Sequence, residues 1–210
     1  MLNPKISVIM ASYLGAYPGS ATNRDKKFVR AVNSFKKQIY QNKELIIVSD
    51  GCQLTVELYN KYFSNEPNIK LMQIPKQQLY SGEMRNVALD VADGDIISYL
   101  DTDDVLGPKH LQIIADGFDL ENYSWIYYND LMVLDSAFKK FYLRVVEPRW
   151  ASIGTSSISH KNLEELRWSK SGGYGHDFLY IIKMASMGLK FKKLKETSQY
   201  IVAHYRDGDF

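Results

Sequence analysis

The chain has 210 residues, of which 45% are hydrophobic and 24% are charged, and its formal net charge is +2. This length and composition are typical of one globular domain with room for a sizeable core. The nearly balanced charge argues against a nucleic-acid binder, and no apolar run is long enough to span a bilayer. The single cysteine, Cys52, excludes an intramolecular disulfide and fits a reducing compartment such as the cytoplasm.

Strands and helices are predicted to alternate through the first half of the chain. Four short apolar runs are typical of strands buried on both faces: residues 5–11, 44–48, 68–74 and 96–100. Apolar residues at helical spacing, or residues that commonly start a helix, predict the elements between and after them: residues 28–39, 54–63 and 81–91, and a helix beginning at Pro108. This alternation predicts an α/β fold with a doubly wound, mostly parallel sheet.

Individual side chains in these helices carry specific expectations. The apolar spacing places Ile39 on the buried stripe of the first helix, and Leu54 and Tyr62 on that of the second. Ser81 is the predicted N-cap of the third helix, because a serine hydroxyl can accept a hydrogen bond from the free backbone amides of the first turn.

The second half is predicted to be mixed. The predicted strands are residues 125–129, 191–194 and 200–204, a hairpin is predicted from 132–134 to 141–146, and a loop with a short strand at 151–160. A helix is predicted at 176–187, with Ile182 and Ala185 in its apolar stripe and Gly188 closing it. We therefore expect a single domain over 1–210, with a nucleotide-type half at 1–104 and a substrate half at 105–210. The final residues read as a chain that continues, which fits one module of a longer protein.

Three carboxylates follow the fourth predicted strand within four residues: Asp101, Asp103 and Asp104. Open α/β sheets bind ligands outside the carboxyl ends of their strands. Because close carboxylates repel each other, a cation is the natural third party, and oxygen ligands suit Mg²⁺ or Mn²⁺, which also hold phosphates. The alternative is a solvated acidic turn, and composition does not decide between the two.

Asp50 and Arg85 add polar chemistry near the same predicted edge. Asp50 ends the second strand in a Ser-Asp-Gly-Cys turn, where its carboxylate either accepts from a nucleotide or shapes the turn. Arg85 could pair with a diphosphate, with Asp101, or only with water, and a surface arginine is the simplest prediction.

Asp177 follows a glycine-rich stretch, residues 172–175, at the start of a predicted helix. A carboxylate there is stabilised by the helix dipole, and this local role is the simpler one. A carboxylate on a glycine-rich loop also suits a general base. The histidines have no zinc-type spacing, and no P-loop, GxSxG or HExxH motif is present.

Together these features resemble the family 2 glycosyltransferases of GT-A fold. The matching motifs lie in the family's order along nearly the whole chain: SVIMASY at residues 7–13, Ser49-Asp50-Gly51-Cys52, Arg85-Asn86, the DxD motif Asp101-Thr102-Asp103, and His176-Asp177. Three departures stand out: Ser49 and His176 replace the family's usual Asp and Glu, and the loop at 14–24 is longer.

The resemblance implies transfer, with inversion, of a sugar from a nucleotide-diphosphosugar, usually a UDP-sugar, to a hydroxyl of a saccharide or lipid-linked acceptor in glycan assembly. Mn²⁺ or Mg²⁺ would bind the diphosphate. The implied roles are donor binding by Ser12, Tyr13, Asp50, Arg85 and Asp101, metal binding by Asp103 and His204, and proton abstraction by Asp177. Two alternatives stay open. A nucleotidyltransferase would need a glycine-rich basic loop after the first strand, and a non-catalytic nucleotide-sugar-binding module would not need both Asp103 and Asp177.

The most basic stretch contains Lys190, Lys192, Lys193 and Lys195. A solvated strand edge is the simpler interpretation of this stretch. A peripheral contact with anionic lipid, at the inner face of a membrane, is the alternative.

Overall fold

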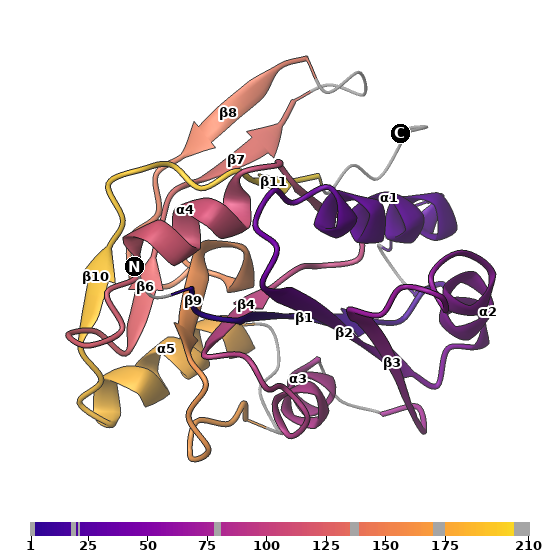
Figure 1. Cartoon of the computed structure of the whole chain (residues 1–210), viewed down its shortest axis with the longest axis horizontal. Coiled ribbons are helices and arrows are strands. Elements are labelled where there is room, and N and C mark those ends of the chain that lie inside the picture. Colours follow the sequence, from indigo (N-terminus) through magenta and orange to yellow (C-terminus); the bar gives the residue numbers. More distant parts are fainter. Residues whose placement is uncertain are drawn as a thin grey trace.

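A seven-stranded sheet crosses the middle of the molecule in the computed structural model (Figure 1), which describes residues 3–17, 20, 22–77, 81–134, 139–169 and 175–203. The strand order is β10-β6-β9-β4-β1-β2-β3. The strands of this sheet are β1 (Ile6–Ser12), β2 (Lys43–Asp50), β3 (Ile69–Ile74), β4 (Ile96–Tyr99), β6 (Trp125–Tyr127), β9 (Ile158–Lys161) and β10 (Phe191–Lys193).

The pairing of these strands confirms a parallel half followed by a mixed half. Strands β1 to β4 are mutually parallel where they pair. Strand β9 runs antiparallel to both β4 and β6, and β10 is parallel to β6. A second sheet has the order β5-β11-β7-β8. Its strands are β5 (Val105–Leu106), β7 (Asp130–Val133), β8 (Phe141–Arg144) and β11 (Tyr200–Val202).

Helices cover both faces of the main sheet and bury two apolar clusters (Figure 1). The helices are α1 (Arg24–Lys36), α2 (Gln53–Tyr62), α3 (Gly82–Leu89), α4 (His110–Gly117), α5 (His176–Ser186) and the short 3₁₀ helix η1 (Thr155–Ser157). One cluster packs side chains of α1 and α4 against β1, and the other packs α3 and α5 against the opposite face. Alternate β1 residues enter the two clusters, as Val8 and Ile9 do, because successive strand side chains point to opposite faces.

Three of the predicted helix faces, those of α1, α2 and α5, were partly wrong. Ile39 lies beyond the end of α1 and is 50% exposed, and Tyr62 of α2 is 47% exposed. In α5 the buried residues are Tyr180, Ile181 and Met184, whereas Ile182 is 48% exposed. Apolar residues occupy a broad arc of these short helices, so periodicity admits two neighbouring faces. In α5 the choice follows from an aromatic partner distant in sequence, Trp168, which stacks on Tyr180 at 3.9 Å between ring centroids.

Asp104, the last of the three clustered aspartates, forms hydrogen bonds within the protein. Asp104 is buried, and its carboxylate accepts hydrogen bonds of 2.8 Å from the Tyr200 hydroxyl and from the backbone N–H of Ala203. The backbone N–H of Asp101 donates to the same tyrosine hydroxyl at 3.1 Å. The expectation that all three carboxylates need a cation was therefore wrong for Asp104, which ties the acidic loop to β11.

No helix within the described ranges is both long and apolar enough to cross a membrane.

The corrected face of α1 predicts a contrast between two truncations. Phe35 is fully buried against the sheet, so Phe35→Ala should lower the free energy of unfolding by about 3–5 kcal/mol. Ile39→Ala should change it by less than about 0.5 kcal/mol, because half of that side chain is already exposed. Urea unfolding of both variants tests the assignment, and equal losses would contradict it.

Candidate active site

Polar residues from three parallel strands meet at one edge of the main sheet. Ser12 ends β1, Asp50 ends β2, and Asp101 follows β4 after one further residue. Because these strands pair in parallel, their carboxyl ends lie on the same side. The helix start that carries Asp177 meets the same region through Arg85 of α3, so the two halves of the chain contribute to one site.

Arg85 lies at the centre of this site. Its side chain is only 5% exposed and approaches three groups. Nη1 lies 3.3 Å from Asp177 Oδ1 and 2.8 Å from His176 Nε2, and Nη2 lies 3.6 Å from Asp101 Oδ1. Of the three predicted partners of Arg85, the structure gives Asp101 and adds Asp177. The prediction of a surface arginine was wrong, because two distant segments fold over this side chain.

The ring of Trp168 packs against the guanidinium of Arg85. The guanidinium lies 4.4 Å from the centroid of the Trp168 ring, within the range of a cation–π interaction. Asn86, the neighbour of Arg85, fixes the Trp168 backbone by two hydrogen bonds: its Oδ1 accepts from the N–H at 2.8 Å, and its Nδ2 donates to the carbonyl at 3.1 Å. Sequence analysis missed Trp168, since no local pattern connects it with a residue 83 positions earlier.

A buried network of neutral groups lies behind Trp168. The Nε1–H of Trp168 donates to the Tyr99 hydroxyl at 3.2 Å, and His160 Nε2 lies 2.6 Å from the same hydroxyl. His160 Nδ1 donates to the Lys161 carbonyl at 2.7 Å, so its Nε2 accepts from the tyrosine. Burial lowers the pKa of His160 to about 4, which leaves the ring uncharged near neutral pH. The side chains behind Trp168 are therefore hydrogen-bonded and uncharged.

Asp177 is held as a carboxylate. Burial raises the pKa of its carboxyl, but hydrogen bonding from His176 and the charge of Arg85 outweigh burial, and the pKa falls below its ordinary value. The Asp177 side chain keeps 29% of its surface exposed. Its Oδ2 lies 3.2 Å from the point where a Cβ on Gly154 would stand. An ionised, partly accessible carboxylate can accept a proton.

His176 Nε2 lies between a hydrogen-bond acceptor and a hydrogen-bond donor. It lies 2.9 Å from Asp177 Oδ1 and 2.8 Å from Arg85 Nη1. A protonated Nε2 donates to the carboxylate, and an unprotonated Nε2 accepts from the guanidinium, so one tautomer cannot make both bonds. Ser81 holds the N-cap position of α3 without capping it by its side chain, and its hydroxyl lies 3.3 Å from the same nitrogen. The predicted capping bond was therefore wrong.

The start of α5 is shaped by a glycine. Gly175 has φ of +108°, and a Cβ at this position would lie 2.1 Å from the Trp150 ring. Both the backbone conformation and the space therefore require glycine. Thr155 of η1 lies between the two halves of the site, because its Oγ1 approaches Asp101 Oδ2 at 3.5 Å and its backbone N–H reaches Asp177. The predicted loop at 151–160 gave no sign of this role.

A second cluster surrounds Asp50. Its buried carboxylate forms an ion pair with Lys76 and accepts a 2.6 Å hydrogen bond from the backbone N–H of Gln77. The Lys76 ammonium lies 4.3 Å from the centroid of the Tyr13 ring. The turn that was considered for Asp50 is made by Ser49, whose hydroxyl bonds both the N–H and the carbonyl of Cys52. A carboxylate offers about four acceptor positions, and the bonds from Lys76 and Gln77 use one position on each oxygen of the Asp50 side chain, which is 2% exposed.

The Ser12 side chain is fully buried beneath α2. Its hydroxyl lies 2.8 Å from that of Thr55 in this helix. A donor contact predicted for Ser12 would therefore use the backbone.

Asp103 is partly exposed and lies beside cations of α1. Its backbone carbonyl accepts from the Arg30 guanidinium, and its charge acts on buried Lys27, whose pKa is lowered by burial and raised by Asp103. Within the described residues, no group of three or more His, Cys, Asp or Glu could hold a metal ion. The predicted second ligand, His204, and the glycines at 172 and 173 lie outside those residues.

The partners of Asp177 predict a pH-dependent stability. Because its folded pKa lies below the unfolded value of about 3.9, its contribution is present above that pH and is lost as the pH falls through the folded pKa. Asp177→Asn should lower the free energy of unfolding by about 1–2 kcal/mol at neutral pH, and by much less once the pH has fallen below the folded pKa. Urea unfolding across this range measures the difference, and a loss that is constant with pH would contradict it.

Comparison with known sequences gives a family match over most of the chain. The model described as glycosyl transferase family 2 matches residues 20–180. An uncharacterized glycosyltransferase of Haemophilus influenzae is 25% identical over 218 residues, covering 99% of this chain and 78% of that protein. The poly(ribitol-phosphate) beta-N-acetylglucosaminyltransferase TarS of Staphylococcus aureus is 30% identical over 118 residues, covering 55% of this chain and 19% of TarS.

Solved structures of low sequence identity share the fold. Residues 1–349 of S. aureus TarS in complex with UDP-GlcNAc give a TM-score of 0.73 at 22% identity, covering 98% of this chain and 60% of that one. The mannosyltransferase PcManGT of Pyrobaculum calidifontis, in complex with GDP-Man and Mn²⁺, gives a TM-score of 0.64 at 15% identity, covering 95% of this chain and 56% of that one. The predicted GT-A fold is thereby confirmed. Because the family match takes in more than half of the chain, the chain belongs to glycosyl transferase family 2.

Proposed function

We propose that this protein transfers a sugar, with inversion, from a nucleotide-diphosphosugar to an acceptor hydroxyl. The observation that carries the proposal is the position of Arg85 between Asp101, at the end of a nucleotide-side strand, and Asp177, at the start of an acceptor-side helix. Inverting transfer needs a donor site and a base on opposite sides of the reacting carbon, and carboxylates on opposite sides of Arg85 support such a site. The TarS complex with UDP-GlcNAc supports a UDP-sugar as the donor.

Asp177 is the proposed general base. Its ionised carboxylate would take the proton of the acceptor hydroxyl as that oxygen attacks the sugar carbon and the bond to the diphosphate breaks. Arg85 and His176 hold the carboxylate in place. After transfer, the nearby Arg85 guanidinium favours the ionised carboxylate of Asp177, so the proton passes on to solvent.

The donor would extend from the Asp50 cluster to Arg85. Asp50 and Tyr13 would contact the nucleoside, Ser12 would contact it through its backbone, and Asp101 would reach the ribose or the sugar. Lys76 joins this set because it bridges the Asp50 carboxylate and the Tyr13 ring. The charge of Arg85 would also stabilise the diphosphate as it leaves.

Asp103 is the proposed protein ligand for Mn²⁺ or Mg²⁺. A partly exposed carboxylate suits a hard ion that takes most of its other ligands from diphosphate oxygens and water. His204 is proposed as a further ligand. The bound ion would neutralise charge that develops on the diphosphate. The complex of PcManGT with GDP-Man and Mn²⁺ supports this metal.

The proposed acceptor is a saccharide or a lipid-linked saccharide in glycan or polysaccharide assembly, with the protein in the cytoplasm. The name of TarS, an N-acetylglucosaminyltransferase that acts on poly(ribitol-phosphate), supports a role in glycan assembly. A nucleotidyltransferase and a non-catalytic binding module are the alternatives that the following experiments separate.

Asp177→Asn should reduce turnover by roughly 10²-fold or more, because a general base contributes about 10²- to 10⁴-fold. Donor affinity should barely change, since the base contacts the acceptor. The measurement is release of nucleoside diphosphate from a nucleotide-sugar panel at saturating donor, together with calorimetric binding of UDP.

His176→Ala is the matched variant for this test. If His176 were the base, this variant would be inactive and Asp177→Asn would keep its activity. UDP binding without turnover on any donor in the panel would favour the binding module, and turnover of nucleoside triphosphates would favour the nucleotidyltransferase.

Asp103→Asn should abolish the Mn²⁺-dependent part of UDP affinity and leave the melting temperature unchanged, since an amide is a weaker ligand for a hard ion than a carboxylate. Calorimetric titration of UDP with and without Mn²⁺ measures this. The control is Asp116→Asn, at an exposed position on α4. Unchanged metal-dependent binding in the Asp103 variant would reject the assignment.

A further inference from the structure

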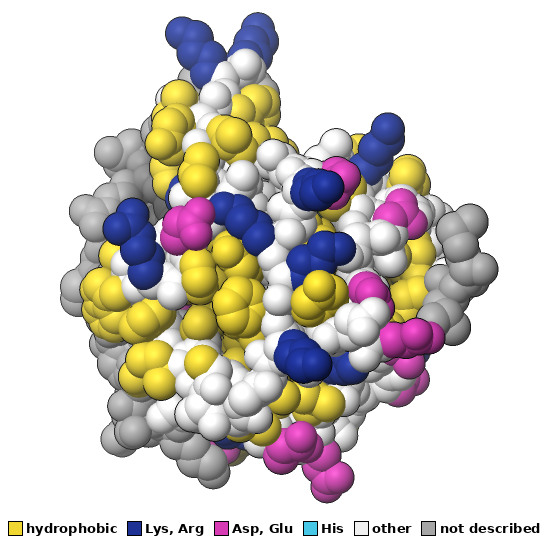
Figure 2. All heavy atoms as spheres, turned by 90° about the vertical axis from the view of Figure 1, so that its left-hand side faces the viewer, with side chains coloured by type: hydrophobic (Ala, Val, Ile, Leu, Met, Phe, Trp, Pro, Cys, Tyr) yellow, Lys and Arg dark blue, Asp and Glu magenta, His cyan; other side chains and the backbone are white. Residues whose placement is uncertain are grey.

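The β7–β8 hairpin projects from the body of the molecule and carries exposed apolar side chains (Figures 1 and 2). Strand β8 forms the edge of the second sheet. Phe141, Tyr142 and Leu143 are 42%, 56% and 43% exposed, and Leu134 and Val145 are more than half exposed. We call these five residues, with Lys139 and Lys140, the hairpin surface.

The hairpin surface is apolar on both of its faces. Successive strand residues point to opposite faces, yet three consecutive apolar residues of β8 are exposed. A flat protein partner would cover one face and leave the other in water. A surrounding medium covers both faces, and the interface of a lipid bilayer is such a medium for aromatic and aliphatic side chains.

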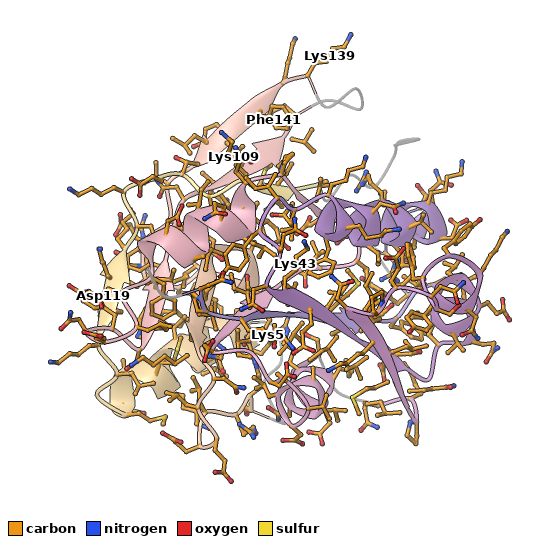
Figure 3. The ribbon with its side chains drawn as sticks, viewed as in Figure 1. Lys5, Lys43, Lys109, Asp119, Lys139 and Phe141 are labelled. Atoms are coloured by element: carbon orange, nitrogen blue, oxygen red, sulfur yellow. The ribbon has the colours of Figure 1, made fainter. Side chains whose placement is uncertain are left out.

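The charge at the end of the hairpin fits an anionic lipid surface. Lys139 and Lys140 are exposed, and Figure 3 shows Lys139 at the far end of the hairpin beyond Phe141. Lysine and tyrosine place polar ends at the headgroups while their apolar parts enter the interface. Lysines at a strand edge also disfavour edge-to-edge pairing with a second copy of the chain.

The Lys190–195 region, which sequence analysis considered for lipid contact, fits less well. It borders a hollow of about 360 Å³ lined by both signs of charge: Asp116, Asp119, Glu196, Lys192 and Lys195. Lys193 pairs with Glu147 at 2.8 Å. Nearby carboxylates largely balance the positive charge of this region. Strand β10 is an edge strand of the main sheet.

A buried ion pair attaches the base of the hairpin to the candidate active site. Asp130 of β7 is fully buried and binds the Arg144 guanidinium through both carboxylate oxygens, one of them at 2.7 Å from Nε. Ser156 of η1 donates to Asp130 at 2.9 Å and accepts from Arg144 at 2.8 Å. Its neighbour, Thr155, contacts Asp101 and Asp177. The base of the hairpin is therefore linked through η1 to both carboxylates of the candidate site, so a membrane that holds the hairpin would lie near that site.

We propose that the hairpin surface inserts into the interface of a membrane containing anionic lipid and docks the protein there. Docking would bring the candidate site close to a lipid-linked acceptor, and only this consequence rests on the proposed function. The docking itself needs no donor, acceptor or turnover.

Vesicle co-sedimentation tests the proposal on the whole chain. The vesicles are phosphatidylcholine with and without phosphatidylserine. We expect binding to the anionic vesicles that weakens as salt is raised. Lys139→Gln with Lys140→Gln should weaken it about 30-fold, because each basic residue near the surface contributes roughly a fivefold gain. Tyr142→Ser with Leu143→Ser should abolish it even at low salt.

The control is Lys61→Gln with Tyr62→Ser on α2, which replaces an exposed lysine and an exposed tyrosine away from the hairpin. It should bind like the unchanged protein, and thermal melts should show that all variants fold. Absence of binding by the unchanged protein, or equal binding by the hairpin variants, would overturn the proposal. So would a dimer in light scattering that Tyr142→Ser with Leu143→Ser dissolves, together with no vesicle binding, since the hairpin would then contact a second copy.

Discussion

The structure depends on one almost fully buried cation. Arg85 contacts Asp101, Asp177 and His176, and its guanidinium lies over the Trp168 ring. Taking a charge out of water costs several kcal/mol unless partners compensate it, and here the compensating groups come from both halves of the chain. The two halves must therefore fold together before the cation is stable, and the same contacts place donor-side and acceptor-side carboxylates around it.

Charged groups contact Arg85 directly, whereas the groups behind Trp168 are uncharged. Behind Trp168, the hydroxyl of Tyr99 and the ring of His160 form hydrogen bonds without carrying charge, since burial keeps His160 neutral. A charged group at this depth would compete for the guanidinium or leave a charge uncompensated. Asn86 completes the support by fixing the backbone of Trp168. Neutral groups thus hold the Trp168 ring on which the cation lies.

The three aspartates of one short stretch have three different environments. Asp101 faces Arg85, Asp103 lies near the cations of α1, and Asp104 is buried and holds β11. At the base of the β7–β8 hairpin, the fully buried carboxylate of Asp130 also has protein partners, Arg144 and Ser156. Asp104 and Asp130 are therefore buried carboxylates with structural partners, whereas Asp101, Asp103 and Asp177 keep part of their surface exposed.

The sequence by itself determined the alternation of strands and helices, the parallel order of the first half, the DxD stretch at a strand end and the family resemblance. These follow from hydrophobic periodicity and from short motifs, which are local properties. Only the tertiary structure decided that Arg85 is buried, that Trp168 supports it, that Ser49 makes the turn beside Asp50, and that Ile182 of α5 faces outward. Each of these depends on contacts between segments distant in the chain or on the direction of a side chain, and neither is encoded in the spacing of residues.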